Sequence, residues 1–128
     1  MKKILAVLFV FAAFNVLAKY QGKLELVDST ELLTNQQAYL VLDTRSKQEF
    51  DAGHIAGAIN IPHDLVADNL SQLKETDKTI VVHCRSGRRA LTAEQALLDA
   101  GFTNLKHLKG DMKGWQANNL PLVVNQTK

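Results

Sequence analysis

The sequence contains a single cysteine, Cys84, and only two prolines in 128 residues. One thiol cannot form a disulfide within the chain, so the sequence excludes a disulfide framework and a cysteine-rich zinc site. It contains no internal repeat or low-complexity stretch. Hydrophobic residues make up 46% of the chain and charged residues 22%, which excludes a disordered or collagen-like protein. At this length we expect one globular domain.

The start of the chain has the pattern of a secretory signal peptide. Lys2 and Lys3 give a positive start, an apolar run follows over residues 4–14, and Val16 and Ala18 precede a possible cleavage point. The run is shorter than the ~20 apolar residues that span a membrane, although an uncleaved anchor is the alternative. We therefore expect residues 1–18 to be a signal peptide that is cleaved after Ala18, and residues 19–128 to be the mature domain.

Removal of this segment would balance the charge of the chain. The full sequence carries a formal net charge of +2, and Lys2 and Lys3 account for the excess. A neutral domain has no general attraction for nucleic acid or for a membrane surface. The sequence thus predicts an exported protein, periplasmic in a Gram-negative bacterium, with no nucleic-acid partner and no stable membrane association after signal removal. We expect a monomer.

Short apolar segments alternate with helical patterns along the rest of the chain. The run Thr79–Cys84 is apolar without clean alternation, which favours burial on both faces, as in a parallel sheet. The order of segments predicts an α/β domain in which helices cover both faces of a mainly parallel, five-stranded sheet. The candidate strands are residues 24–27, 39–42, 58–61, 79–84 and 104–108, and the candidate helices are residues 28–34, a brief one after Ser46, 64–73, 88–100 and 111–117.

The cysteine is followed by a loop suited to an anion. Cys84 ends the strongest strand, and Arg85–Arg89 contains three arginines and Gly87 before a helix begins. Ligands of open α/β sheets bind at this end of the strands, and a helix N-terminus attracts anions. The same surroundings stabilise a thiolate, so the pattern predicts a nucleophile beside a site for an anionic substrate. The alternatives are a buried core cysteine before a solvated basic turn, and a cysteine that forms an intermolecular bond.

The segment Cys84–Arg89 resembles the Cys-x-x-Gly-x-Arg active loop of rhodanese-like sulfurtransferases. Two further signatures of that family resemble segments of this chain. The signature upstream of the cysteine resembles Asp43–Arg45, Glu49–Phe50 and Gly53–Pro62. The signature downstream of it resembles Leu108–Gly110, Trp115 and Leu120–Pro121. Two positions depart from the family pattern: Asp111 stands where a second glycine is common, and Ala90 stands where a small hydroxyl residue is frequent.

The resemblance implies a small, single-domain rhodanese. Cys84 would accept a sulfane sulfur from thiosulfate or a similar donor as a persulfide, and would pass it to cyanide or a thiol without any metal or cofactor. Asp43 and Arg45 would organise the site, with Arg45 as an ion-pair partner. The substrate-binding residues would be those of the loop, with Arg89 orienting the loop or the substrate: Arg85, Ser86, Gly87, Arg88 and Arg89.

The histidines carry no predicted catalytic role. His83 should face away from Cys84, because neighbouring strand residues point to opposite faces. His54 is expected to hydrogen-bond the backbone of its turn. His63 and His107 show no spacing typical of metal ligands.

Two other functions stay open. A non-enzymatic module that carries persulfide sulfur or binds a partner would need the same thiol. A phosphatase or arsenate reductase of related fold would have five residues between cysteine and arginine, whereas four separate Cys84 from Arg89. The tighter loop favours a small sulfur anion over a phosphoester, an argument that rests on the family.

Overall fold

The computed structural model describes residues 24–125, so the predicted signal peptide at residues 1–18 lies outside the described residues. The strands form one sheet in the order β1-β5-β4-β2-β3, and every neighbouring pair is parallel. The predicted parallel, five-stranded sheet is therefore confirmed. The strands are β1 (Leu26–Val27), β2 (Tyr39–Asp43), β3 (Ile59–Asn60), β4 (Thr79–His83) and β5 (Leu105–Leu108).

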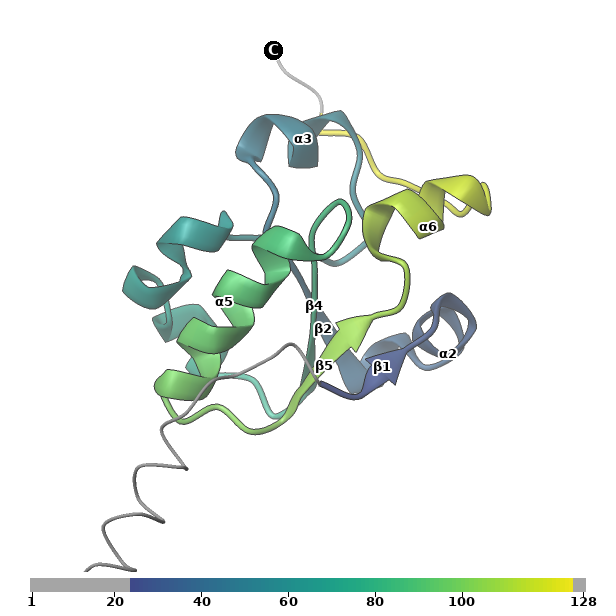
Figure 1. Cartoon of the computed structure of the whole chain (residues 1–128). Helices are drawn as coiled ribbons and strands as arrows, with labels where there is room; N and C mark the ends of the chain where they lie inside the picture. The colour runs from purple at the N-terminus through teal and green to yellow at the C-terminus, as the bar shows by residue number, and fades with distance from the viewer. Residues whose placement is uncertain (1–23, 126–128) are drawn as a thin grey trace, which may run out of the picture.

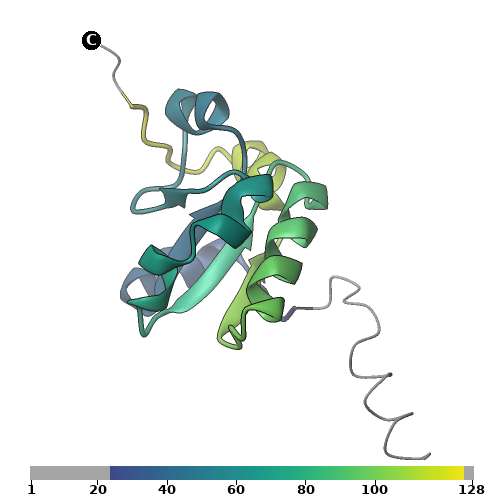
Figure 2. The ribbon, with the colours of Figure 1, turned by 90° about the vertical axis from the view of Figure 1, so that its left-hand side faces the viewer.

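Helical segments connect these strands and cover both faces of the sheet. They are α2 (Ser29–Thr34), the 3-10 helix η1 (Gln36–Ala38), α3 (Lys47–Ala52), the 3-10 helix η2 (His63–Asp68), α4 (Ser71–Lys74), α5 (Arg88–Asp99) and α6 (Asp111–Ala117). One face carries α5, and the other carries α2 and α6 (Figure 1). Figure 2 looks onto the first face, where α5 packs beside η2. No helix among residues 24–125 has the length and hydropathy needed to cross a membrane.

The central position of β4 explains why apolar and polar residues do not alternate along its sequence. Ile80 and Val82 pack in the core beneath α5, whereas Val81 packs in the second core beneath α2 and α6. All three side chains are buried, because helices cover both faces of the sheet. The strand thus ends deep within the domain, and the residue that follows it, Cys84, begins the loop to α5.

Two helix starts follow the capping patterns of the sequence. The Asp28 side chain accepts a hydrogen bond from the Glu31 backbone N–H at the start of α2. Ser46 and Glu49 form a reciprocal capping box at the start of α3. The second cap also fixes where the Glu49 side chain lies, which matters for the loop described below.

The predicted helix over residues 64–73 is wrong. The structure has the 3-10 helix η2 and the short helix α4 in its place, separated by Asn69 and Leu70. Asn69 has φ −137° and ψ 48°, outside the helical region, and its side chain donates to the Leu65 carbonyl. An asparagine side chain that bonds local backbone competes with the helical hydrogen bonds, which accounts for the break.

Candidate functional site

The cysteine loop, residues 84–89, joins the end of β4 to the start of α5. Gly87 is the N-cap of α5 and has φ 105°, a left-handed conformation that favours glycine. In Figure 1 the loop lies between the facing ends of α5 and α6. The predicted strand–loop–helix arrangement around the cysteine is therefore present.

Cys84 is only 1% exposed and belongs to the core beneath α5. Its sulfur accepts a hydrogen bond from the Gly87 backbone N–H, with an N–S distance of 2.9 Å. The loop thus folds back over its own first residue. A sulfur that accepts a backbone N–H is placed where negative charge on it is stabilised.

The first turn of α6 holds the backbone of this loop. The Met112 N–H donates to the Cys84 carbonyl and the Lys113 N–H donates to the Arg85 carbonyl, both at 3.0 Å. At the other side of the loop, the N–H groups of Arg88 and Arg89 belong to the first turn of α5, where they have no acceptor within the helix. These amides and the positive end of the helix dipole favour an anion beside the cysteine sulfur.

The three loop arginines lie in different surroundings. Arg85 and Arg88 are exposed, as is Ser86, whereas Arg89 is half-buried. The Arg89 guanidinium makes two hydrogen bonds to the Glu49 carboxylate of α3, at 2.7 and 3.0 Å. The structure therefore ties Arg89 to α3 and leaves Arg85 and Arg88 as the solvent-facing cations of the loop.

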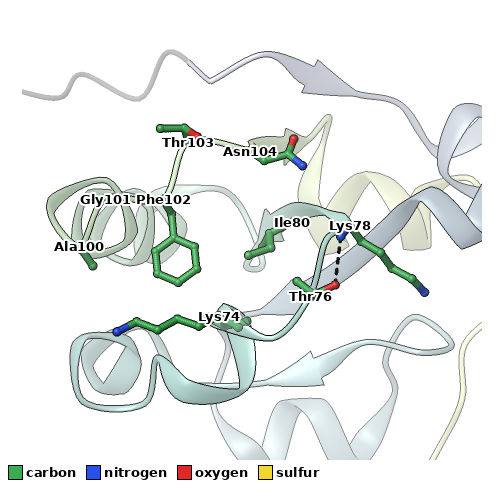
Figure 3. A pocket seen from close by; sticks show the side chains of 10 residues that line it. Lys74, Thr76, Lys78, Ile80, Ala100, Gly101, Phe102, Thr103 and Asn104 are labelled. Atoms are coloured by element: carbon green, nitrogen blue, oxygen red, sulfur yellow. Dashed lines mark hydrogen bonds between the residues drawn. The ribbon is translucent and has the colours of Figure 1, made fainter.

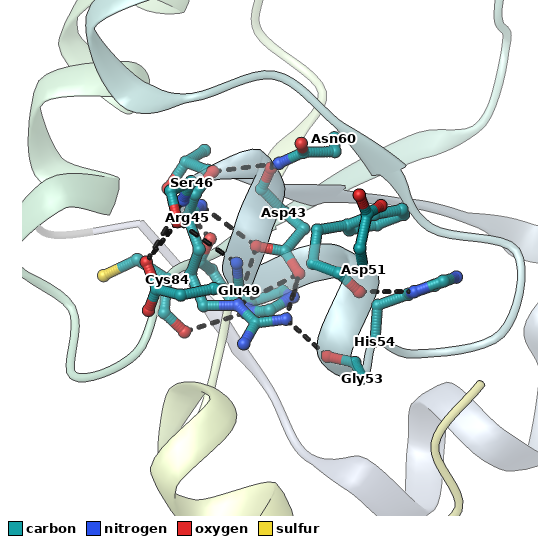
Figure 4. A network of polar contacts seen from close by, with 12 residues as sticks. Asp43, Arg45, Ser46, Glu49, Asp51, Gly53, His54, Asn60 and Cys84 are labelled. Carbon is teal, nitrogen blue, oxygen red and sulfur yellow. Dashed lines mark hydrogen bonds and ion pairs between the residues drawn. The ribbon is translucent and has the colours of Figure 1, made fainter. Parts of the chain in front are cut away.

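Asp43 and Arg45 form a buried ion pair at the end of β2 (Figure 4). The Arg45 Nη2 donates to Asp43 Oδ2 at 2.8 Å and to the Gly53 carbonyl at 2.7 Å. The Asn60 side chain donates to the backbone carbonyls of both residues of the pair. In Figure 4 the Cys84 sulfur points away from Asp43. The ion pair thus stabilises the end of β2, the strand next to β4, and does not contact the Cys84 sulfur.

His83 lies on the opposite face of β4 from Cys84. Val82 and Cys84 pack beneath α5, and Val81 packs on the other side, so strand alternation places His83 with Val81. Burial lowers the pKa of His83, although the carboxylate of Asp43 nearby opposes this shift. The neutral ring donates from Nδ1 to the Cys84 carbonyl at 2.9 Å. The ring therefore contacts the backbone of the loop and not its thiol.

Sequence reasoning missed a buried polar cluster formed by Glu94, His107 and Asp111. Asp111 Oδ1 accepts the Cys84 backbone N–H at 3.0 Å, and Asp111 Oδ2 lies 2.9 Å from His107 Nε2. His107 Nδ1 lies 2.5 Å from Glu94 Oε2. Two signals were available: an aspartate at a glycine position of the family pattern, and an acid on the buried stripe of α5 that includes Ala90, Ala93 and Leu97.

Two surface hollows lie away from the cysteine loop. One, of about 330 Å³, is at the amino end of β4 and includes Lys74, Ile80 and Phe102 (Figure 3). Ile80, its lining residue on β4, precedes Cys84 by four positions, roughly 13 Å along a strand. The other, of about 290 Å³, lies between α2 and Trp115. Neither hollow is lined by residues 84–89, so neither contains the thiol.

The structure contains no group of three or more His, Cys, Asp or Glu side chains that could hold a metal ion within residues 24–125. The Glu94–His107–Asp111 cluster is instead joined by its own hydrogen bonds.

The ion pair between Arg89 and Glu49 is expected to make stability depend on pH in acid. The hydrogen bond from Arg89 is the main reason that the pKa of Glu49 falls from 4.5 to about 2. The contribution of the ion pair to the free energy of unfolding is therefore complete above pH 4.5 and is lost as the pH falls through about 2. Both side chains are about one-third exposed, so we expect a contribution of no more than about 1 kcal/mol.

Urea unfolding of the wild type and of Glu49→Gln between pH 2 and pH 7 measures this contribution. The two proteins should differ most at neutral pH and converge in acid. Glu75→Gln, at an exposed glutamate, is the matched control and should follow the wild type. A constant difference across the whole pH range would contradict the ion-pair explanation.

Comparison with known proteins agrees with this arrangement. The chain is 39% identical over 98 residues to the uncharacterized protein YibN of Escherichia coli strain K12, covering 75% of this chain and 68% of YibN. It is 37% identical over 92 residues to the chloroplastic thiosulfate sulfurtransferase 16 of Arabidopsis thaliana, covering 62% of this chain and 76% of that protein. The crystal structure of a rhodanese-related protein from Thermoplasma volcanium superposes with a TM-score of 0.70 at 31% identity, covering 79% of this chain and 99% of that one.

The Rhodanese-like domain family matches residues 26–118, a range that contains the sheet, the cysteine loop and α6 through Ala117. Since the match spans most of the chain and the fold agrees with it, the protein belongs to the rhodanese-like domain family.

Proposed function

We propose that the protein is a thiosulfate-type sulfurtransferase in which Cys84 carries the transferred sulfur. The rhodanese-like family acts on sulfur donors and acceptors in general, and one relative of this chain is named a thiosulfate sulfurtransferase. The observation that carries the proposal is the hydrogen bond from the Gly87 N–H to the Cys84 sulfur, inside a loop that also contains two exposed arginines. This arrangement stabilises negative charge on sulfur and attracts an anionic donor.

In the first step, the Cys84 thiolate attacks the outer sulfur of thiosulfate. A sulfur–sulfur bond forms to Cys84, the original one breaks, and sulfite leaves with the bonding electron pair. The terminal sulfur of the resulting persulfide stands about 2 Å beyond Sγ. Its negative charge is stabilised by the same loop amides that surround the Cys84 sulfur.

In the second step, cyanide or a thiolate attacks the terminal sulfur, and Cys84 leaves as a thiolate. Arg85, Ser86 and Arg88 form the exposed rim that meets the donor and acceptor. Arg89 acts through its ion pair with Glu49, which holds the loop against α3. The same chemistry needs no metal and no organic cofactor.

The direct test is the intact mass of the protein after treatment with thiosulfate. One sulfur atom should be added to Cys84, and cyanide should remove it with release of thiocyanate. Sulfate, which has no sulfane sulfur, is the matched control and should leave the mass unchanged. Turnover of phosphate esters without any persulfide would favour oxyanion chemistry instead, and an adduct that neither cyanide nor thiols discharge would favour a sulfur carrier.

We also propose that the chain is exported and that its mature form starts at Lys19. The basis is the signal-peptide pattern of residues 1–18. Intact mass of the protein from the periplasm of a Gram-negative host should correspond to residues 19–128. Leu8→Arg, which interrupts the apolar run, should block processing, whereas Lys19→Gln just after the cleavage point should not. Full-length protein retained in the membrane would contradict the proposal.

A further inference from the structure

Asp111 adopts a backbone conformation that is uncommon outside glycine, although aspartate and asparagine tolerate it better than other residues. Its φ is 54°, in the left-handed region, and it follows Gly110, which has φ 83°. A non-glycine residue pays a steric cost there, which a glycine would not. The residue is also 5% exposed, so its carboxylate is buried as well. A buried, strained aspartate needs specific partners to offset both costs.

Those partners lie on the cysteine loop and beneath it. One carboxylate oxygen accepts the Cys84 backbone N–H at 3.0 Å. The other lies 2.9 Å from His107 Nε2, and a Cβ atom added to Gly87 would lie 3.3 Å from the same oxygen. The carboxylate thus accepts a hydrogen bond from the loop at Cys84 and leaves little room for a side chain at Gly87, whose N–H donates to the sulfur.

His107 and Glu94 hold this carboxylate in place. Burial lowers the pKa of His107, but hydrogen bonds to Asp111 and Glu94 outweigh it and raise the pKa to about 10. The ring is therefore an imidazolium at neutral pH and donates from both nitrogens, to Glu94 of α5 and to Asp111 of α6. With Oδ2 occupied by His107, Oδ1 faces the Cys84 amide.

The connections of the cluster indicate that its role is geometric. Its hydrogen bonds join His107 of β5 to Glu94 of α5 and to Asp111 of α6, whose carboxylate accepts the Cys84 backbone N–H. We propose that Asp111, held by His107 and Glu94, is a positioning residue that fixes the backbone of Cys84 and Gly87 and so keeps the Gly87 N–H aimed at the sulfur. The link to sulfur transfer rests on the proposed function.

Two substitutions of Asp111 separate the effect of its hydrogen bond to Cys84 from the effect of its negative charge. Asp111→Gly keeps the left-handed conformation available but removes the acceptor, whereas Asp111→Asn keeps an acceptor oxygen, tolerates the conformation and removes the negative charge. In single-turnover loading by thiosulfate, Asp111→Gly should be slower by about 10-fold or more, as expected for the loss of a hydrogen bond to a charged group. Asp111→Asn should stay within about 3-fold of the wild type, because the acceptor is retained.

Hydrogen exchange of the Cys84 amide, measured by NMR, gives a readout that does not depend on sulfur transfer. Asp111→Gly should speed exchange at Cys84 by about 10-fold or more, whereas Asp111→Asn should not, and the Val81 amide in the middle of β4 should be unchanged in both. An unchanged Val81 shows that the sheet is intact.

The results distinguish failure of the proposed function from failure of the positioning role of Asp111. If the wild type does not load with thiosulfate, the proposed function fails and amide exchange alone decides the role of Asp111. The positioning role is overturned if Asp111→Gly exchanges and loads like the wild type, or if Asp111→Asn loses as much as Asp111→Gly, since that would assign the effect to charge.

Discussion

Replacing Cys84 with serine is expected to reduce sulfur transfer by a factor on the order of 10⁴ or more, as for the removal of other enzymatic nucleophiles. A serine hydroxyl is not ionised at neutral pH, and the hydrogen-bond partner of this side chain is the Gly87 N–H rather than an imidazole that could activate it. His83 lies on the opposite face of β4 and donates to the Cys84 carbonyl. The substitution preserves the shape of the side chain, and the new oxygen can still accept the Gly87 N–H. The fold should therefore be retained while the chemistry is lost.

The assay is thiocyanate release from thiosulfate and cyanide, with intact mass as a second readout. Ser71→Ala, at an exposed serine of α4 outside the cysteine loop, is the matched control and should retain the activity of the wild type. Transfer by the Cys84→Ser protein at a rate near that of the wild type would show that the sulfur is carried elsewhere.

Asp43→Ala is expected to destabilise the protein by about 3–5 kcal/mol, the usual cost of removing one partner from a buried ion pair. Asp43 is fully buried and Arg45 is 5% exposed, so the guanidinium would be left without its counter-ion in the core. The change also removes the carboxylate that accepts both the Arg45 backbone N–H and its Nε–H, each at 3.0 Å.

Urea unfolding at neutral pH measures this loss. The double variant Asp43→Ala/Arg45→Met should recover part of the stability, because the unpaired charge is gone. Asp64→Ala, at an exposed aspartate, is the matched control and should change stability by less than about 0.5 kcal/mol. A loss of under about 1 kcal/mol in Asp43→Ala would show that water reaches the Arg45 guanidinium and that the pair is not truly buried.

The elements that the sequence predicts well are those determined by local chemistry. The apolar run at Thr79–His83 forms the central strand, and the brief helix expected after Ser46 begins there with a capping box of Ser46 and Glu49. The helix start depends on interactions within a few residues, and the strand is recognised from its own apolar composition although it pairs with the distant strands β2 and β5. The helix predicted over residues 64–73 fails for a local reason too, since apolar spacing does not show that the Asn69 side chain donates to the Leu65 carbonyl.

The candidate site is less predictable because distant segments build it. Three arginines look alike in the loop sequence, but Arg89 differs from Arg85 and Arg88 because Glu49, 40 residues earlier, binds its guanidinium. The Asp111 carboxylate meets the Cys84 amide across 27 residues. Such contacts depend on how α3 and α6 pack, which spacing along one segment does not reveal.

The strand order also sets when the site can form as the chain is made. β1 is the first strand, yet it pairs with β5, the last. The cysteine loop likewise needs the amides of Met112 and Lys113, which are made well after Cys84 itself. Closing these long loops has an entropic cost that local helices cannot offset, so folding waits for distant segments to meet. A chain stopped before α6 would carry the cysteine but not the hydrogen bonds from Met112 and Lys113 that hold the loop around it.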